Sequence, residues 1–323
     1  MVLAMTAIIA GFILLVWSAD RFVEGAASTA GHAGLPSILI GMVIVGFGTS
    51  APEMVVSAMA ASDGNPDLAL GNALGSNIVN ISLILGVTAI IAPITVQSKI
   101  VKNELPLLLV VVLFLGYLLY DGALSVIDAS LLLGGLVLFL AWSVYSGMKS
   151  PSDTLKTEFD TELKSHAMSL GKAIFWLIVG LTLLIISSRI LVWGAVEIAT
   201  ALGVSDLIIG LTIIALGTSL PELAASIIAA KKGEHDIAIG NVVGSNMFNI
   251  LAVIGIAGII EPIPHISTDV IYRDWSVMLV LSVMLLVMAY GFGRQGRVNR
   301  WEGGVLLTSY IAYNGYLVNS IIN

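Results

Sequence analysis

The sequence contains no cysteine and very little charge. Cysteine is absent from all 323 residues, which excludes a disulfide framework and any thiolate metal site. Asp, Glu, Lys and Arg make up only 11% of the chain, less than half of the roughly 25% that is typical of soluble proteins. Hydrophobic residues reach 58%, and the mean hydropathy is +1.01. This composition excludes an ordinary soluble domain and indicates a protein embedded in lipid.

Apolar blocks separated by polar breaks predict an all-α polytopic membrane protein with about ten transmembrane helices, each long enough for the roughly 20 residues that a bilayer requires. The first block lacks a basic region and a cleavage site, so we interpret it as a retained helix rather than a signal peptide. The polar stretch 149–168 is expected to be a cytoplasmic connecting loop between two five-helix units, 1–148 and 169–323. The expected helices are 3–30, 37–61, 67–92, 104–120, 124–147, 169–200, 206–230, 236–260, 275–292 and 302–321.

The two units are copies of each other. A shift of 169 residues places 46–86 on 215–255 without a gap, and 19 of these 41 positions are identical. The shared residues include GTS at 48–50, PE at 52–53 and GSN at 75–77. Hydrophobic bias alone matches Leu with Leu or Ala with Ala, but it does not match Gly, Ser, Asn, Pro and Glu in register. We therefore interpret the repeat as a structural duplication.

The second copy is predicted to be inverted, because equivalent helices are five spans apart and five is odd. The loops agree: the turn after the first motif helix reads SDGNPD, whereas its counterpart reads KKGEHD. Since Lys and Arg stay on the cytoplasmic side, we expect both termini outside in a multi-pass protein of the cell (cytoplasmic or inner) membrane. Among the loops the outer side then carries only Arg273, and the inner side carries Lys99, Lys102, Lys149, Lys156, Lys164, Lys172, Lys231, Lys232, Arg294, Arg297 and Arg300.

Two glutamates stand alone inside predicted helices. Glu53 is the only charged residue in 33–62, and Glu222 is the only one in 207–230. A bare charge at such a depth costs at least about 2.5–3.5 kcal/mol. A buried glutamate that is hydrogen-bonded to a neighbouring helix is the simpler interpretation. The same cost at two repeat-related positions favours a functional site.

The residues around each glutamate supply oxygen atoms. Pro52 and Pro221 cannot donate a backbone hydrogen bond, so the carbonyl four residues earlier, in Gly48 and Gly217, loses its helical partner. Hydroxyls lie three and four residues before each carboxylate, on the same helix face. These hydroxyls belong to Thr49, Ser50, Thr218 and Ser219, and the following helices add Asn72, Ser76, Asn80, Asn241, Ser245 and Asn249.

This set has no nitrogen or sulfur ligand, which is typical of sites for hard cations. Ca²⁺ accepts six to eight oxygens in flexible geometry, and two carboxylates balance its charge. A softer metal would require His or Cys, whereas the four histidines lie in or beside predicted loops. Asp20, Arg21, Glu24 and Arg189 lie near predicted membrane interfaces, and we interpret them as boundary anchors, with gating as the alternative.

GTSAPE and LGTSLPE, each followed by a GSN helix, resemble the two alpha-repeats of the sodium/calcium exchangers in the calcium/cation antiporter superfamily. The resemblance implies an electrogenic antiporter, not an enzyme, that exchanges several Na⁺ for one Ca²⁺ without a cofactor. The implied Ca²⁺ ligands are Glu53, Glu222 and backbone oxygens of Thr49 and Thr218. The implied Na⁺ ligands are the same two glutamates with Ser50, Ser76, Ser219, Ser245 and the backbone of Gly46 and Ala215. Asn80 and Asn249 would lie at the centre, with Asn72, Asn241, Pro52 and Pro221 behind them.

Two departures from relatives accompany the resemblance. Potassium-dependent members carry an Asp where this chain has Asn249, and the large regulatory domain of animal exchangers has no room in a central loop of about twenty residues. The lipid bilayer and the transported ions are the expected partners, with no nucleic acid and no protein partner implied. A proton/calcium exchanger of the same superfamily stays open as an alternative. A cation channel is a weaker one, because a continuous pore does not need inverted halves.

Overall fold

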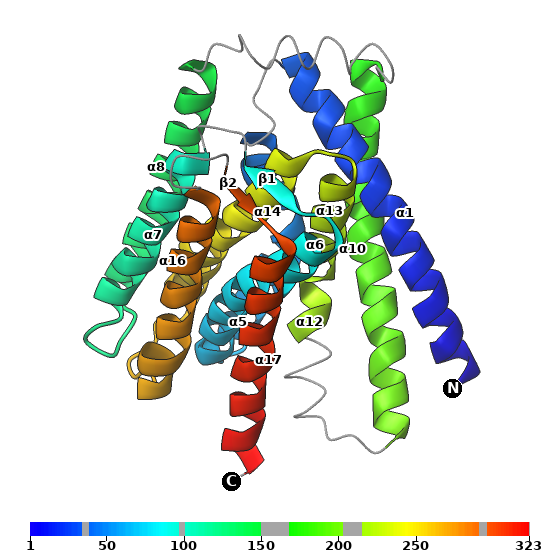
Figure 1. The fold of residues 1–323 in the computed structure, drawn as a ribbon. Coiled ribbons are helices and arrows are strands. Elements are labelled where there is room, and N and C mark those ends of the chain that lie inside the picture. Colours follow the sequence, from blue (N-terminus) through cyan, green and yellow to red (C-terminus); the bar gives the residue numbers. More distant parts are fainter. Residues whose placement is uncertain (34–38, 97–100, 150–167, 203–214, 291–295, 323) are drawn as a thin grey trace.

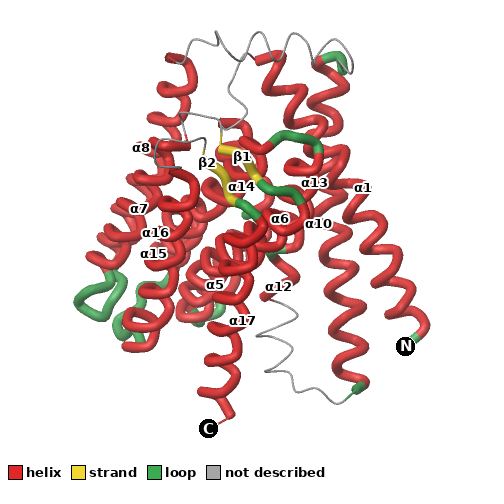
Figure 2. The backbone as a smooth tube through the Cα atoms, viewed as in Figure 1, coloured by secondary structure: helices red, strands yellow, loops and turns green. Residues whose placement is uncertain are grey.

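The computed structural model describes residues 1–33, 39–96, 101–149, 168–202, 215–290 and 296–322. Helices account for almost all of them. The described residues include two short strands, β1 and β2, which Figure 2 draws in yellow. Most of the predicted connecting loop and the first part of the predicted helix 206–230 lie outside the described residues, as do Lys99, Lys156, Lys164 and Arg294.

The first half contains five helical segments at the predicted positions, and several of them are interrupted. The second and third segments each change between α- and π-helix along their length. The elements are α1 (Val2–Ala33), η1 (Ile40–Val45), α3 (Gly46–Thr49), α4 (Ala51–Ser62), α5 (Pro66–Val79), η2 (Asn80–Leu85), α6 (Gly86–Ile91), β1 (Ile94–Val96), α7 (Val101–Leu118) and α8 (Val126–Lys149).

The second half repeats this order, except that the π-helix η5 precedes α16, and the counterpart of η1 lies outside the described residues. From the motif helices onward, α3 to α6 match α12 to α15 residue for residue at the shift of 169. The elements are α10 (Leu170–Ala201), α12 (Ala215–Thr218), α13 (Leu220–Lys231), α14 (His235–Phe248), η4 (Asn249–Ile254), α15 (Gly255–Ile260), η5 (Val270–Trp275), α16 (Ser276–Tyr290), β2 (Gly296–Val298) and α17 (Arg300–Ile322). The repeat is therefore conserved even in its helix breaks.

The two halves are inverted relative to each other. Both chain ends lie at one end of the molecule, whereas α8 ends and α10 begins at the opposite end (Figure 1). The equivalent long helices α1 and α10 consequently run in opposite directions side by side. By length and composition, six described helices could cross a membrane, or seven with the bent pair Ile40–Thr49 and Ala51–Ser62. Among the described residues, ten helical segments agree in position with the ten predicted spans. The test of length and composition supports only six or seven of them individually.

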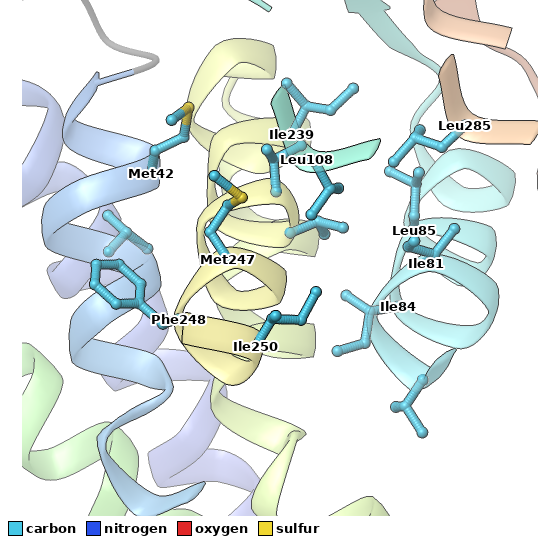
Figure 3. Packing of buried hydrophobic residues seen from close by; sticks show 14 of the residues in the cluster. Met42, Ile81, Ile84, Leu85, Leu108, Ile239, Met247, Phe248, Ile250 and Leu285 are labelled. Atoms are coloured by element: carbon cyan, nitrogen blue, oxygen red, sulfur yellow. The ribbon is translucent and has the colours of Figure 1, made fainter. Parts of the chain in front are cut away.

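The centre of the molecule is formed by the helices that follow the motif glutamates. Of the most apolar window in 66–91, 67% of the residues are buried, and in 235–260 the share is 83%, compared with 22–33% in the other candidate spans. In Figure 3, Met247 and Ile250 lie between Met42 on one side and Ile81 and Ile84 on the other. The outer helices expose their apolar side chains, as expected of surfaces that face lipid.

Short β pairings join the two halves, which the sequence analysis did not predict. Strand β1 pairs antiparallel with β2, with Ile94 opposite Val298. A single bridge between Leu124 and Ile263 connects the halves again. Ile94 and Ile263 are equivalent under the shift of 169, so each half contributes the segment after its central helix to a pairing with the other half. These pairings satisfy backbone groups where the helices end.

Candidate functional site

Both motif helices break at a serine three residues before the glutamate. Helix α3 ends at Thr49, Ser50 has φ −80° and ψ 0°, and α4 starts at Ala51. The two helical parts form an angle of 45°. Ser219 has nearly the same backbone angles, φ −91° and ψ 6°, between α12 and α13. The local unwinding predicted from Gly and Pro is therefore present in both halves.

The break places both glutamates in the first turn of a helix. Glu53 lies in the first turn of α4, and Glu222 lies in the first turn of α13. The free N–H groups and the helix dipole favour negative charge at this position. The sequence predicted the unwinding, but it did not predict that both glutamates lie in the first turn of a helix.

The two carboxylates are buried together without a counter-ion. Glu53 and Glu222 are each 1% exposed, and their charges repel each other. Oε2 of Glu222 has no hydrogen-bond partner, and Oε1 of Glu222 accepts one long bond of 3.5 Å from the Ser50 hydroxyl. Glu53 interacts with the Thr218 side chain, but neither of its carboxylate oxygens accepts a hydrogen bond of normal geometry. None of the ion pairs between described residues includes either glutamate. Two buried acids in this situation are either protonated or compensated by bound cations.

Further unsatisfied oxygens lie on other predicted site residues. Buried side-chain oxygens without a hydrogen-bond partner include Oγ of Ser219, Oδ1 of Asn80 and Oδ1 of Asn249. All three residues are about 1% exposed. Together with the glutamates, they leave six buried oxygens from both halves available for a cation. This observation fits the all-oxygen donor set expected for Na⁺ and Ca²⁺ as transported substrates.

The first motif helix contacts the central helix of the opposite half. Thr49 Oγ1 donates a hydrogen bond to Asn241 Oδ1 at 3.1 Å and lies 3.4 Å from Ser245 Oγ. The Ser245 hydroxyl also lies 3.4 Å from the carbonyl oxygen of Gly46. Gly46 and Thr49 are almost 200 positions away from Asn241 and Ser245 in the sequence, and the fold brings these predicted site residues together.

Glycines permit this close approach. A Cβ atom on Gly46 would lie 3.0 Å from the backbone nitrogen of Ser245, and one on Gly244 would collide with the carbonyl group of Met42. Helix α14 therefore packs directly against the backbone of η1 and α3.

Asn72 and Asn241 hold the glutamate-bearing helices from behind. The Asn241 amide donates to the Glu222 carbonyl at 3.1 Å and to Ser226 Oγ at 2.8 Å. Asn72 donates to Ser57 Oγ at 2.9 Å and to the Glu53 carbonyl at 3.5 Å. Ser57 and Ser226 were missed in the sequence analysis, although each follows its glutamate by four residues and is identical in both copies.

Two further contacts were not anticipated. Ser188 in α10 donates a hydrogen bond of 2.7 Å to the carbonyl of Gly217, so this carbonyl, which Pro221 deprives of its helical partner, has a partner from another helix. In the first half, the N–H of Ser50 donates to the carbonyl of Gly46 at 3.0 Å. Asn80 donates at 3.0 Å to Oδ1 of Asn246, whose equivalent Asn77 is fully buried with no partner for its amide.

The remaining predicted site residues lie on the motif helices and on the helix that follows the first motif. Ser76 is 5% exposed on α5, and Pro52 and Pro221 begin the first turns of α4 and α13. Thr218 and Ala215 lie on α12, and the side chain of Ala215 is outside the described part. In the described part of the chain, no cluster of three or more His, Cys, Asp and Glu residues could hold a metal ion. The site therefore depends on two acids and many neutral oxygens.

Residues 3–145 and 172–319 match the sodium/calcium exchanger protein family. The chain belongs to this family. It is therefore a membrane transporter of the antiporter kind and not an enzyme.

Similar proteins cover almost the whole chain. CaxA of Alkalimonas amylolytica, named as a proposed antiporter, is 50% identical over 322 residues, covering 99% of this chain and all of that protein. The sodium/calcium exchanger MaX1 of Methanosarcina acetivorans is 28% identical, with 94% of this chain and 95% of that protein covered. A solved structure of the sodium–calcium exchanger NCX_Mj superimposes with a TM-score of 0.83 at 32% identity, covering 98% of both chains.

Proposed function

We propose that this family member is an electrogenic sodium/calcium antiporter that exchanges several Na⁺ for one Ca²⁺ by alternating access. The observation that carries the proposal is the set of six unsatisfied, buried oxygens on Glu53, Glu222, Ser219, Asn80 and Asn249. The break before each glutamate and the inverted arrangement of the halves are typical of secondary transporters with a site near the membrane midplane.

The charge of the site favours Ca²⁺ as one substrate. Two carboxylates carry −2, which balances one Ca²⁺, and its ligands would be Glu53 and Glu222 with backbone oxygens of Thr49 and Thr218. Ca²⁺ tolerates irregular geometry with six to eight oxygens. The two glutamates lie close enough to interact, and the Ser50 hydroxyl from the first half already reaches Glu222. One ion could therefore contact both halves at once.

Neutral oxygens around the glutamates favour Na⁺ as the counter-substrate. Na⁺ would be held by the glutamates together with hydroxyl and carbonyl oxygens. A proton, by contrast, binds to a carboxylate without these additional ligands. The proposed Na⁺ ligands are Ser50, Ser76, Ser219, Ser245 and the backbone of Gly46 and Ala215, with Asn80 and Asn249 at the centre. Three Na⁺ would exceed the site charge by +1, whereas Ca²⁺ balances it, so exchange would move net charge.

The orientation follows from the basic residues. We propose that the chain lies in the cell membrane with both termini outside and the central loop in the cytoplasm. Lys172 lies near the start of α10, Lys231 at the end of α13 and Arg300 at the start of α17. Helix α10 starts at the molecular end opposite the termini (Figure 1). Basic residues remain on the cytoplasmic side.

The test is ⁴⁵Ca²⁺ uptake into vesicles that contain the purified protein. Vesicles loaded with Na⁺ should accumulate Ca²⁺ faster than vesicles loaded with choline. A third set with a pH gradient and no Na⁺ separates the proton/calcium alternative. Uptake that is driven by the pH gradient and indifferent to Na⁺ would replace the proposal with proton exchange.

A further inference from the structure

Helices α1 and α10 form a pair that is symmetric under the repeat. Gly11 on α1 packs against the backbone of Leu191, and the equivalent Gly180 on α10 packs against the backbone of Phe22. Both contacts are related by the same shift of 169. A Cβ on any of the four interface glycines (Gly11, Gly25, Gly180 and Gly194) would lie within about 3 Å of the partner helix's backbone. The pair is therefore tightly packed, and its contacts follow the same shift of 169 as the repeat.

An ion pair ties α1 to the central bundle at one end of the molecule. Lys232, directly after α13, lies 2.9 Å from Oδ1 of Asp20 and also donates to the backbone carbonyl of Asp20 at 3.4 Å. Both side chains are about one-third exposed, at 32% and 37%. The next acid on α1, Glu24, pairs within its own helix with Arg21. Asp20 therefore provides the ion pair that leads from α1 to the end of α13.

The repeat places a second pair of opposite charges at the other end. Under the shift of 169, Asp20 corresponds to Arg189 on α10, and Lys232 corresponds to Asp63 directly after α4. Both signs are reversed, so the two positions again attract each other. In the structure Arg189 and Asp63 are exposed, and no ion pair within 4 Å joins them among the described residues.

We propose that Asp20–Lys232 and Arg189–Asp63 are alternative ion pairs that position the α1–α10 pair in the two opposite orientations of the transport cycle. Inverted repeats alternate by exchanging the conformations of their halves. The contact that α1 makes with the end of α13 in one orientation is then made by α10 with the end of α4 in the other. This inference rests on the proposed alternating access, but it does not depend on which ion drives it.

The four residues are positioning residues, because none of them contacts the glutamate site. The expected effect is modest, since partly exposed ion pairs contribute little free energy. Breaking one pair should shift the ratio of the two orientations about two- to fivefold toward the other. Their function would be to balance the two orientations, since either pair alone would bias the transporter toward one side.

Cross-linking tests the unformed pair. The natural chain has no cysteine, so Asp63→Cys with Arg189→Cys introduces the only two thiols. A short bifunctional thiol reagent is used because cysteines whose Cα atoms are more than about 7 Å apart cannot form a disulfide directly. A protease site inserted in 150–167 reports the product, since the two halves stay joined after cleavage only if they are cross-linked. Lys232→Ala should raise the cross-linking rate about two- to fivefold, whereas Lys231→Ala, an exposed control one residue away, should not change it.

A second cysteine pair, at the ion pair that is formed in the structure, keeps the test informative if the first double variant does not fold. Asp20→Cys with Lys232→Cys should cross-link readily, and Arg189→Ala should accelerate this reaction. Exchanging the charges by Asp20→Lys with Lys232→Asp should return the Asp63–Arg189 cross-linking rate to its starting value. The absence of any cross-link between positions 63 and 189, or an equal effect of Lys231→Ala, would overturn the inference. These readouts need no ion gradient, so a protein that cross-links as expected but fails to exchange Na⁺ for Ca²⁺ would refute only the proposed function.

Discussion

Asn241 is the residue whose substitution should most clearly weaken the connection between the two halves of the site. It is completely buried on α14. Its amide donates to the carbonyl of Glu222 and to Ser226, and its Oδ1 accepts from Thr49 in the other half. Asn241→Ala removes all three hydrogen bonds and leaves three buried polar groups without this partner.

The magnitude follows from these bonds. A hydrogen bond contributes about 1 kcal/mol net, and an unsatisfied buried partner adds to the loss, so Asn241→Ala should destabilise the protein by roughly 3 kcal/mol. The repeat supplies a matched control in Asn72, which is only half-buried and makes one short bond, to Ser57, and one of 3.5 Å. Asn72→Ala should cost about 1 kcal/mol.

Thermal unfolding of the purified variants in detergent measures the difference. By the scaling of soluble proteins, roughly 3 kcal/mol corresponds to a decrease in Tm of about 4–5 °C for a chain of this length. A double-mutant cycle of Asn241→Ala with Thr49→Val isolates the bond between the halves, with an expected coupling of about 1 kcal/mol. Equal Tm losses for Asn241→Ala and Asn72→Ala, with no coupling to Thr49, would refute this account of how the halves are joined.

The other predictions concern charge and packing. Glu53→Gln and Glu222→Gln should each insert normally yet abolish Na⁺-driven ⁴⁵Ca²⁺ uptake, because Ca²⁺ loses half of its compensating charge; wild-type uptake by either variant would mean that the site lies elsewhere. Uptake should respond to a clamped vesicle potential, and an unchanged rate at opposite signs would indicate an electroneutral ratio. Exchange should persist when K⁺ is replaced by choline, since Asn249 adds no negative charge to compensate a K⁺ carried together with Ca²⁺; the same measurement on Asn249→Asp tests for acquired K⁺ dependence. Gly244→Ala should destabilise the protein by about 1–3 kcal/mol, and Gly75→Ala, with no described atom within 4 Å of its added Cβ, should not; similar Tm values for the two would contradict the packing argument.

The repeat and the helix breaks could be predicted because they depend on local chemistry. Pro52 and Pro221 remove a donor wherever they stand in a helix, and a gap-free shift of 169 already places Glu53 and Glu222 at equivalent positions. The structure confirms these features down to identical bounds for the motif helices. The ligand assignments around the glutamates stay predictions, although their unsatisfied oxygens are consistent with them.

The contacts between distant segments could not be predicted in this way. Ser188 reaches Gly217 only because α10 crosses the motif helix, and Ile94 pairs with Val298 across about 200 residues. A hydrophobic pattern specifies which face of a helix is buried, but it does not specify the partner of a polar group on that face. Asp20 was interpreted as a boundary anchor for the same reason, since its partner Lys232 belongs to the other half.

Counterflow of the two ions tests the central claim most directly. Vesicles that contain the protein are loaded with ²²Na⁺ and diluted into ⁴⁵Ca²⁺, and both fluxes are followed in the same sample. The account predicts that Na⁺ leaves only when Ca²⁺ is present, in a fixed ratio above two, and that both fluxes disappear together in Glu222→Gln. Ca²⁺ entry that continues in vesicles without internal Na⁺, or a Na⁺ efflux that ignores external Ca²⁺, would contradict it.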